Sequence, residues 1–269
     1  MPKAKASARR ATGSQSQAEG PPRAFGKRLA ACRPPPPLPL AFRYLRESRD
    51  FATGFLFILP LLVGYEVGLM LLRSNVINWA HGIIRLVLLA FGPAEPALFA
   101  GLVACLVVLA LRRVERLRVD AELYGLMLVE SLVYACAMAL VCTVVARRLM
   151  LMGAPPCERG LARDVVLSVG AGVYEEVLFR VVLLGAIYYA LKSWAGMKPG
   201  LAAFLSIVAS SLTFAACHHL GPYGDPLEAS RLAYRFGMGV LFAGIYIYRG
   251  LGIVVYTHAL YDIFVTVGR

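Results

Sequence analysis

Long apolar stretches, separated by short polar ones, cover this chain from residue 51 onward. About 20 apolar residues are enough for one helical crossing of a bilayer. Stretches of that kind lie at 51–72, 94–111, 123–146, 163–192, 199–218, 232–248 and 251–267. The amphipathic stretch 77–91 is too short to cross, and 41–50 is typical of an amphipathic lead-in to the membrane. The pattern predicts an all-α polytopic membrane helical bundle with about seven transmembrane helices.

The first 50 residues have a different composition. They contain 11 Lys or Arg but only three acidic residues, and a run of prolines occupies 34–37. Polar, basic and Pro-rich segments of this kind bury too little apolar surface to fold. Residues 1–50 are therefore predicted to form a disordered, basic, Pro-rich cytoplasmic tail. Residues 2–30 lack the apolar core of a signal peptide, so the helix that begins at 51 is expected to be retained.

Overall composition excludes an ordinary soluble protein. Hydrophobic residues make up 59% of the 269 residues, against about 45–50% in soluble domains. The net charge of +12 is concentrated near the first membrane helix, where basic residues set topology and contact anionic lipid. We therefore expect the lipid bilayer, and no nucleic acid, as a partner. The basic tail favours a cytoplasmic N-terminus.

Two adjacent carboxylates interrupt the apolar stretch 163–192. An ionised group at the centre of a spanning helix costs about 2.5–3.5 kcal/mol on insertion scales and usually marks function. Glu176 and Arg180 are four residues apart and share a helix face, so they can form an ion pair. Glu175 points about 100° away and lacks that partner, which makes it a candidate general base. The alternative is an ion pair that only holds helices together.

Two histidines and one further acid lie in later apolar stretches. His218 follows Phe214 by four residues at the end of 199–218, and His258 precedes Asp262 by four residues. An acid on the same helix face can orient an imidazole, or both side chains can bind a metal. The alternatives are a helix-end histidine and a buried hydrogen bond. His219 lies off the face of Phe214 and is interpreted as a bystander.

Taken together, these groups indicate hydrolysis by one of two routes. Glu175, His218 and His258 can hold a divalent metal such as zinc and leave a position for water. Without a metal, the same groups can bind a water for the glutamate base and donate hydrogen bonds to an oxyanion. The HExxH pattern of zincins and the GxSxG elbow of serine hydrolases are absent from the sequence.

The three ordered motifs resemble those of the CPBP family, which comprises type II CAAX prenyl endopeptidases and bacteriocin-processing or self-immunity membrane proteins. These motifs are Glu175-Glu176-xxx-Arg180, Phe214-xxx-His218 and His258-xxx-Asp262. The resemblance covers about 120–269. The apolar stretches predict N-terminal transmembrane helices at 51–122, and the resemblance implies a catalytic membrane domain at 123–269.

The resemblance also implies roles for the motif residues. Glu175 activates water, while Glu176 and Arg180 shape the site. His218 and His258 bind the water, the oxyanion or a metal, and Asp262 orients His258. The family has been described both as metallopeptidases and as metal-independent glutamate peptidases, and the sequence leaves that choice open.

We therefore predict an intramembrane endopeptidase that acts on a membrane-associated protein or peptide. The Ala-, Arg- and Leu-rich composition favours the inner membrane of a bacterial cell. Two alternatives stay open: a proton-coupled transporter that uses the same buried acids and histidines, and a non-catalytic membrane immunity or partner scaffold. The sequence does not decide whether Glu66 and Glu130 extend the site or only pair helices.

Overall fold

A computed structural model of the chain describes residues 40–73, 76–117, 121–148, 160–220 and 224–268. Most of the predicted tail, 1–39, and most of the connector after residue 148 lie outside the described residues. Leu38–Arg269 form one packed unit. Helices on both sides of the predicted domain boundary at 122 pack against each other within this unit. The division into two membrane domains therefore stays a prediction.

The described residues form helices and no strand, which confirms the all-α class. In chain order the helices are α1 (Leu40–Glu47), α2 (Phe51–Leu71), α3 (Trp79–Leu89), η1 (Gly92–Ala94), α4 (Glu95–Leu117), α5 (Ala121–Arg148), α6 (Leu161–Gly170), η2 (Ala171–Glu175), η3 (Val177–Leu184), α7 (Gly185–Tyr189), η4 (Ala190–Trp194), α8 (Pro199–Cys217), α9 (Ala229–Arg249) and α10 (Leu251–Val267). η1 is a 3₁₀ turn, whereas η2, η3 and η4 are π-helical.

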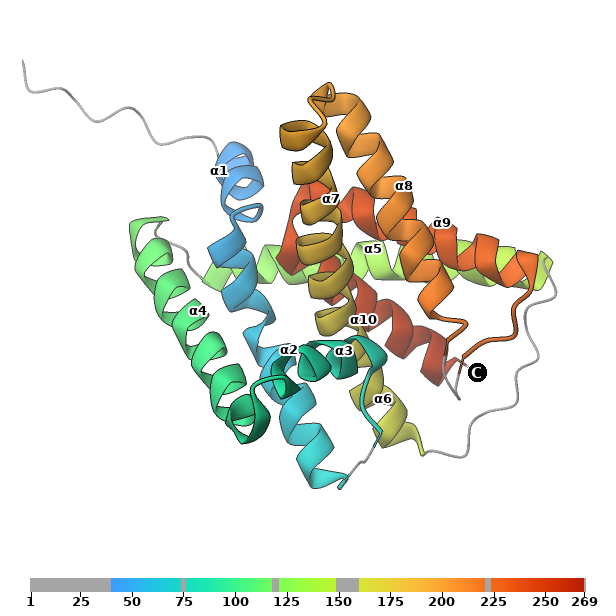
Figure 1. Cartoon of the computed structure of the whole chain (residues 1–269), viewed down its shortest axis with the longest axis horizontal. Coiled ribbons are helices and arrows are strands. Elements are labelled where there is room, and N and C mark those ends of the chain that lie inside the picture. Colours follow the sequence, from blue (N-terminus) through green and yellow to red (C-terminus); the bar gives the residue numbers. More distant parts are fainter. Residues whose placement is uncertain (1–39, 74–75, 118–120, 149–159, 221–223, 269) are drawn as a thin grey trace, which may run out of the picture. The chain divides into compact units, whose positions relative to one another are not determined.

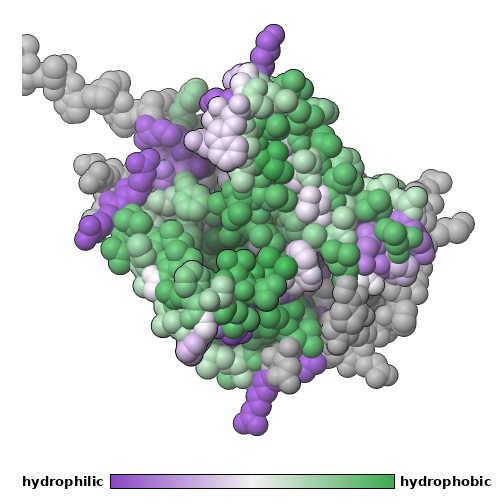
Figure 2. Space-filling view, viewed as in Figure 1, coloured by the Kyte–Doolittle hydropathy of each residue, from purple (hydrophilic) through white to green (hydrophobic). Residues whose placement is uncertain are grey.

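Four helices among the described residues are long and apolar enough to cross a membrane. They are Phe51–Leu71, Gly92–Val114, Ala121–Val145 and Pro199–Cys217. In Figure 1, the axes of α2 and α4 lie roughly along the vertical of the page, while the axis of α5 lies across it. The face drawn in Figure 2 is mostly hydrophobic, with hydrophilic residues gathered toward its edges. These findings support an integral membrane protein, and the count of seven transmembrane helices stays a prediction.

One predicted boundary is wrong. The apolar stretch 94–111 was expected to end at Arg112-Arg113, but α4 continues to Leu117. Arginine is a good helix former, so these charges end the apolar stretch without ending the helix. Hydrophobicity therefore located the membrane-crossing part of α4 but not its C-terminus.

Polar caps and one glycine set where key helices begin. Asp50 accepts hydrogen bonds from the backbone N–H groups of Ala52 and Thr53 at the start of α2. Asn78 does the same at the start of α3, for Ala80 and His81. Such caps satisfy backbone donors that have no partner within the helix. Gly250 has a φ of +85°, a conformation that favours glycine, and it turns the chain from α9 into α10.

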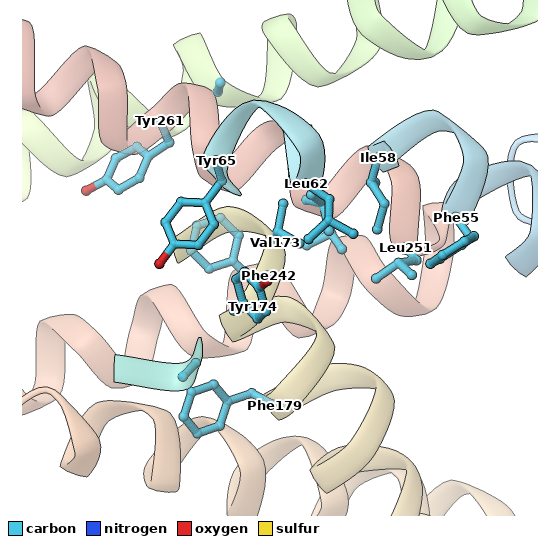
Figure 3. Packing of buried hydrophobic residues seen from close by; sticks show 14 of the residues in the cluster. Phe55, Ile58, Leu62, Tyr65, Val173, Tyr174, Phe179, Phe242, Leu251 and Tyr261 are labelled. Carbon is cyan, nitrogen blue, oxygen red and sulfur yellow. The ribbon is translucent and has the colours of Figure 1, made fainter. Parts of the chain in front are cut away.

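α10 lies at the centre of the unit. It packs against α2, α5, α6, α9 and η2, and Ile253, Val254 and Val255 are fully buried. Figure 3 shows how the surrounding core is filled, with Tyr65 of α2 beside Tyr174 of η2. Because α10 carries His258, this packing fixes one histidine of the predicted site against the helix that carries Glu175.

Glycine allows the backbones to approach closely at the contact between η2 and α10. A Cβ added at Gly172 would lie 2.7 Å from Ala259 Cβ and 2.9 Å from the Val255 carbonyl oxygen. Gly172 thus permits the close approach that small residues allow between membrane helices. Any larger side chain there has to push α10 away from the residues that precede Glu175.

We expect Gly172→Ala to lower the thermal midpoint in detergent, because overpacking of this kind costs about 1–3 kcal/mol. Gly185→Ala is the matched control, since a Cβ at Gly185 meets nothing within 4 Å. That control should be neutral or slightly stabilising because alanine is the better helix former. Equal midpoints for the two variants in differential scanning fluorimetry would contradict the close contact.

Candidate active site

The predicted acidic helix, 163–192, is present as the continuous helical segment from α6 through η4. Its middle is π-helical, with Glu175 at the end of η2 and Glu176 just before η3. In a π-helix the hydrogen bonds span five residues, and such turns are rare outside functional sites. The wide turns therefore coincide with the two acids that the sequence singled out.

Glu176 is the centre of a buried charged cluster. Its side chain is fully buried, with one carboxylate oxygen 3.1 Å from Arg180 Nε and the other 2.7 Å from His258 Nδ1. Arg180 is also buried and donates to the Gly239 carbonyl oxygen at 3.2 Å. Its guanidinium lies 4.7 Å from the ring centre of Phe214, a favourable cation–π distance. The predicted Glu176–Arg180 pair is therefore present, and it joins α8, α9 and α10.

His258 lies between two carboxylates. Besides the contact with Glu176, its Nε2 lies 3.5 Å from Asp262 Oδ2. The imidazole stacks on Phe242, with ring centres 4.2 Å apart. An imidazolium can donate an N–H to each carboxylate. Sequence spacing predicted Asp262 as the partner of His258, but Glu176 is the closer one.

Glu175 faces His218 instead of His258. Glu175 Oε2 and His218 Nε2 are 3.8 Å apart. His218 Nδ1 lies 2.8 Å from the Phe214 carbonyl oxygen and must donate its proton there. In the neutral ring, Nε2 is then a hydrogen-bond acceptor. Glu175 Oε2 makes no hydrogen bond to the described residues, so two acceptors face each other across a short gap.

The other oxygen of Glu175 is occupied. Asn78 Nδ2 donates to Glu175 Oε1 at 2.9 Å. The side chain of Glu175 keeps 10% of its surface exposed and that of His218 keeps 20%. Unlike Glu176, these two side chains therefore keep some exposed surface, although Glu175 Oε2 itself is buried.

A tethered loop holds His218 at the end of α8. The Asp225 N–H donates to the His218 carbonyl oxygen at 2.8 Å. The Asp225 carboxylate binds Arg235 of α9, with a shortest distance of 2.8 Å. Burial raises the pKa of Asp225, but the charge and hydrogen bonds of Arg235 outweigh burial and hold that pKa below its usual value. His219 Nδ1 donates to the Asp225 carbonyl oxygen at 3.0 Å.

The six predicted residues thus form two adjoining groups. Glu176, Arg180, His258 and Asp262 make one charged cluster, while Glu175 and His218 make the other pair. The ring of Phe214 lies between the histidines, 4.5 Å from His218 and 6.2 Å from His258 between ring centres.

The predicted metal ligands Glu175, His218 and His258 do not make a ligand set. Both nitrogens of His258 face carboxylates, and Nδ1 of His218 is bound to a carbonyl oxygen. No group of three His, Cys, Asp or Glu among the described residues is arranged to hold an ion. The divalent metal therefore stays a prediction.

The structure separates the two acids that the sequence left undecided. Glu130 forms an ion pair with Arg249 and accepts a hydrogen bond from Tyr44, so it joins α1, α5 and the end of α9. Glu66 accepts a hydrogen bond from Tyr174, directly before Glu175. Glu130 therefore pairs helices, whereas Glu66 lies next to the site.

Comparison with known proteins supports the reading of these motifs. Residues 160–264 match the family of type II CAAX prenyl endopeptidases, Rce1-like. The match covers less than half of the chain but contains all six predicted site residues. It confirms the resemblance and identifies this segment with a class of membrane proteases. No curated protein and no solved structure matches the chain.

Glu176→Gln should be far more destabilising than Glu175→Gln. Removing one partner of a buried ion pair costs about 3–5 kcal/mol, and Glu176 has two such partners. The Glu175 side chain keeps some exposed surface, and a glutamine at this position can still accept a hydrogen bond from Asn78 Nδ2. A loss of unfolding free energy within about 1 kcal/mol is therefore expected. Thermal unfolding of both variants in the same detergent tests this prediction. An equal fall in thermal midpoint for both would contradict the different structural roles of Glu175 and Glu176.

Asp225→Asn should lower stability near neutral pH by no more than about 1 kcal/mol, since the Arg235 pair is partly exposed. The pKa of Asp225 is depressed in the folded state. The carboxylate therefore stabilises the folded protein at pH values above its usual pKa, and this stabilisation is lost as the pH falls through the folded-state pKa. The difference in thermal midpoint from wild type should therefore begin to shrink below about pH 4 and vanish once the pH is below the folded-state pKa. A difference that persists unchanged at pH 3 would contradict the ion pair.

Proposed function

We propose that this protein is an intramembrane endopeptidase that hydrolyses a peptide bond of a membrane-associated protein or peptide. The observation that carries the proposal is the facing pair of Glu175 Oε2 and neutral His218 Nε2, 3.8 Å apart. Both atoms are acceptors, and a water molecule has two O–H donors. One water can therefore donate to both atoms and present its lone pair to a carbonyl carbon.

In the proposed first step, Glu175 acts as general base. It takes a proton from the water as the water oxygen attacks the scissile carbonyl carbon, and the carbonyl oxygen becomes an oxyanion. The ring of His218 holds the water through Nε2. A base of this kind contributes about 10²–10⁴-fold to the rate.

In the second step, the tetrahedral intermediate collapses. The C–N bond breaks, and Glu175 returns the proton to the leaving amine. His258 is the proposed oxyanion donor, because its Nε2–H makes only a long contact with Asp262, 3.5 Å between heavy atoms. Asp262 orients the ring, and Glu176 with Arg180 fixes it from the other side.

The substrate class rests on the family match and on the apolar helices around the site. We propose cleavage near the membrane surface, in the inner membrane of a bacterial cell, with a cytoplasmic N-terminus. The lipid bilayer is then a partner in presenting the substrate to Glu175.

Glu175→Gln should reduce peptide cleavage at least about 10²-fold while folding is retained, because the amide cannot accept the proton. Glu122→Gln on the exposed start of α5 is the matched control and should cleave at the wild-type rate. A second matched pair compares His218→Gln, expected to be inactive, with His219→Gln, expected to be active. The assay uses a fluorogenic peptide library with purified protein in nanodiscs.

Two results, one from this assay and one from a separate flux measurement in sealed vesicles, would overturn the mechanism. Full activity of Glu175→Gln would remove the general base. Ion-coupled flux without peptide products, abolished by the same variants, would favour a transporter. Metal analysis of the active sample decides the cofactor question, since a stoichiometric ion with chelator-sensitive cleavage would require a different ligand arrangement.

A further inference from the structure

Asn78 reaches Glu175 from outside the segment that matches the protease family. It lies in the N-terminal half of the chain, at the start of α3, whereas the match begins at residue 160. Its side-chain amide donates to Glu175 Oε1 at 2.9 Å. Neither composition nor spacing singled this residue out.

Several contacts hold the Asn78 side chain in place. Its Oδ1 accepts from the backbone N–H groups of Ala80 at 2.9 Å and His81 at 3.4 Å. With the oxygen bound as a helix cap, the amide nitrogen must point away from α3. The two halves of the amide thus have fixed and different partners, which also settles which atom is nitrogen.

The backbone of Asn78 is fixed as well. Its N–H donates to the hydroxyl of Tyr65 at 3.1 Å, and that hydroxyl lies 3.0 Å from Nδ1 of the buried His81. Tyr65 is fully buried in α2 and contacts Tyr174, the residue before Glu175. A hydrogen-bond network of Tyr65 in α2 and His81 in α3 therefore holds the backbone of Asn78 in place.

We propose that Asn78 is a positioning residue for the general base. The amide holds Glu175 Oε1, so that the carboxylate presents Oε2 to His218. The inference rests on the proposed peptidase function and extends it, because a residue of the N-terminal helices then completes a site whose other members all lie within 160–264.

The chemistry explains why one donor matters here. The terminal torsion of a glutamate side chain is broad and has no strong preference of its own. Asn78 therefore contributes the orientation that a general base requires.

Two substitutions separate this role from capping. Asn78→Ser and Asn78→Thr both keep a helix cap, but the serine and threonine side chains are too short to reach Glu175. Both should lower kcat about tenfold or more with KM within about twofold, and the thermal midpoint should stay close to wild type. Asn78→Ala removes cap and donor together and should lose stability as well as kcat.

A structural role alone gives the opposite pattern. If Asn78 only caps α3, the serine and threonine variants keep the wild-type kcat and only the alanine variant is impaired. That result would overturn the inference. So would a change confined to KM, because it would place Asn78 in substrate binding.

A second readout does not depend on turnover. Hydrophobic carbodiimides modify carboxyl groups that they can reach, and peptide mass spectrometry locates the adduct. Glu175 should label about threefold or more faster in Asn78→Ser than in wild type, because the amide no longer holds and covers Oε1, and the terminal torsion of the side chain is free to turn. Glu66, which binds Tyr174 and not Asn78, is the internal reference on the same sample.

The two readouts distinguish failure of the inference from failure of the proposed function. Faster labelling of Glu175 in a protein that cleaves no peptide supports the positioning contact and counts against the peptidase. Cleavage that requires Glu175, with kcat and labelling both unchanged in the serine and threonine variants, keeps the peptidase and overturns the role of Asn78.

Discussion

Neutralisation of buried charge is the constraint on which the rest of this structure depends. Glu176 and Arg180 have almost no exposed surface, and an isolated ion in such a place is very costly. Glu176 uses one oxygen for Arg180 and the other for His258. Arg180 in turn binds the backbone of α9. Satisfying these groups fixes the positions of three helices at once, and the predicted site is built around that fixed point.

The same cluster explains how two adjacent glutamates come to differ. Glu176 points into the charged cluster, with Oε1 bonded to His258 and Oε2 3.1 Å from Arg180 Nε. Glu175 is rotated by one residue on the helix and keeps part of its side chain exposed, with Oε1 held by Asn78 and Oε2 opposite His218. One carboxylate is therefore paired with a guanidinium, whereas the other lies between an amide and an imidazole. The different surroundings of the two acids follow from these neighbours.

The N-terminal helices contribute more than membrane crossing. α2 and α3 supply Tyr65, His81 and Asn78, which lie directly behind the residues that lead to Glu175. At a separate place in the fold, Glu130 and Arg249 join α5 to the turn between α9 and α10. Polar side chains in these apolar helices thus serve mainly to connect helices, and one of them connects to the reactive acid.

The sequence by itself determined the helical class, most helix bounds and the six motif residues, because hydrophobicity and charge are local properties that spacing reveals. It also paired Glu176 with Arg180 correctly, since residues four apart share a helix face. It could not assign Glu176 to His258, Glu175 to His218 or Asn78 to Glu175. Those contacts join residues 82, 43 and 97 positions apart. Only the packing of η2 against α3 and α10, and of η3 against α8, brings them within reach. The long-range contacts, and with them which oxygen of Glu175 faces His218, were decided by the tertiary structure.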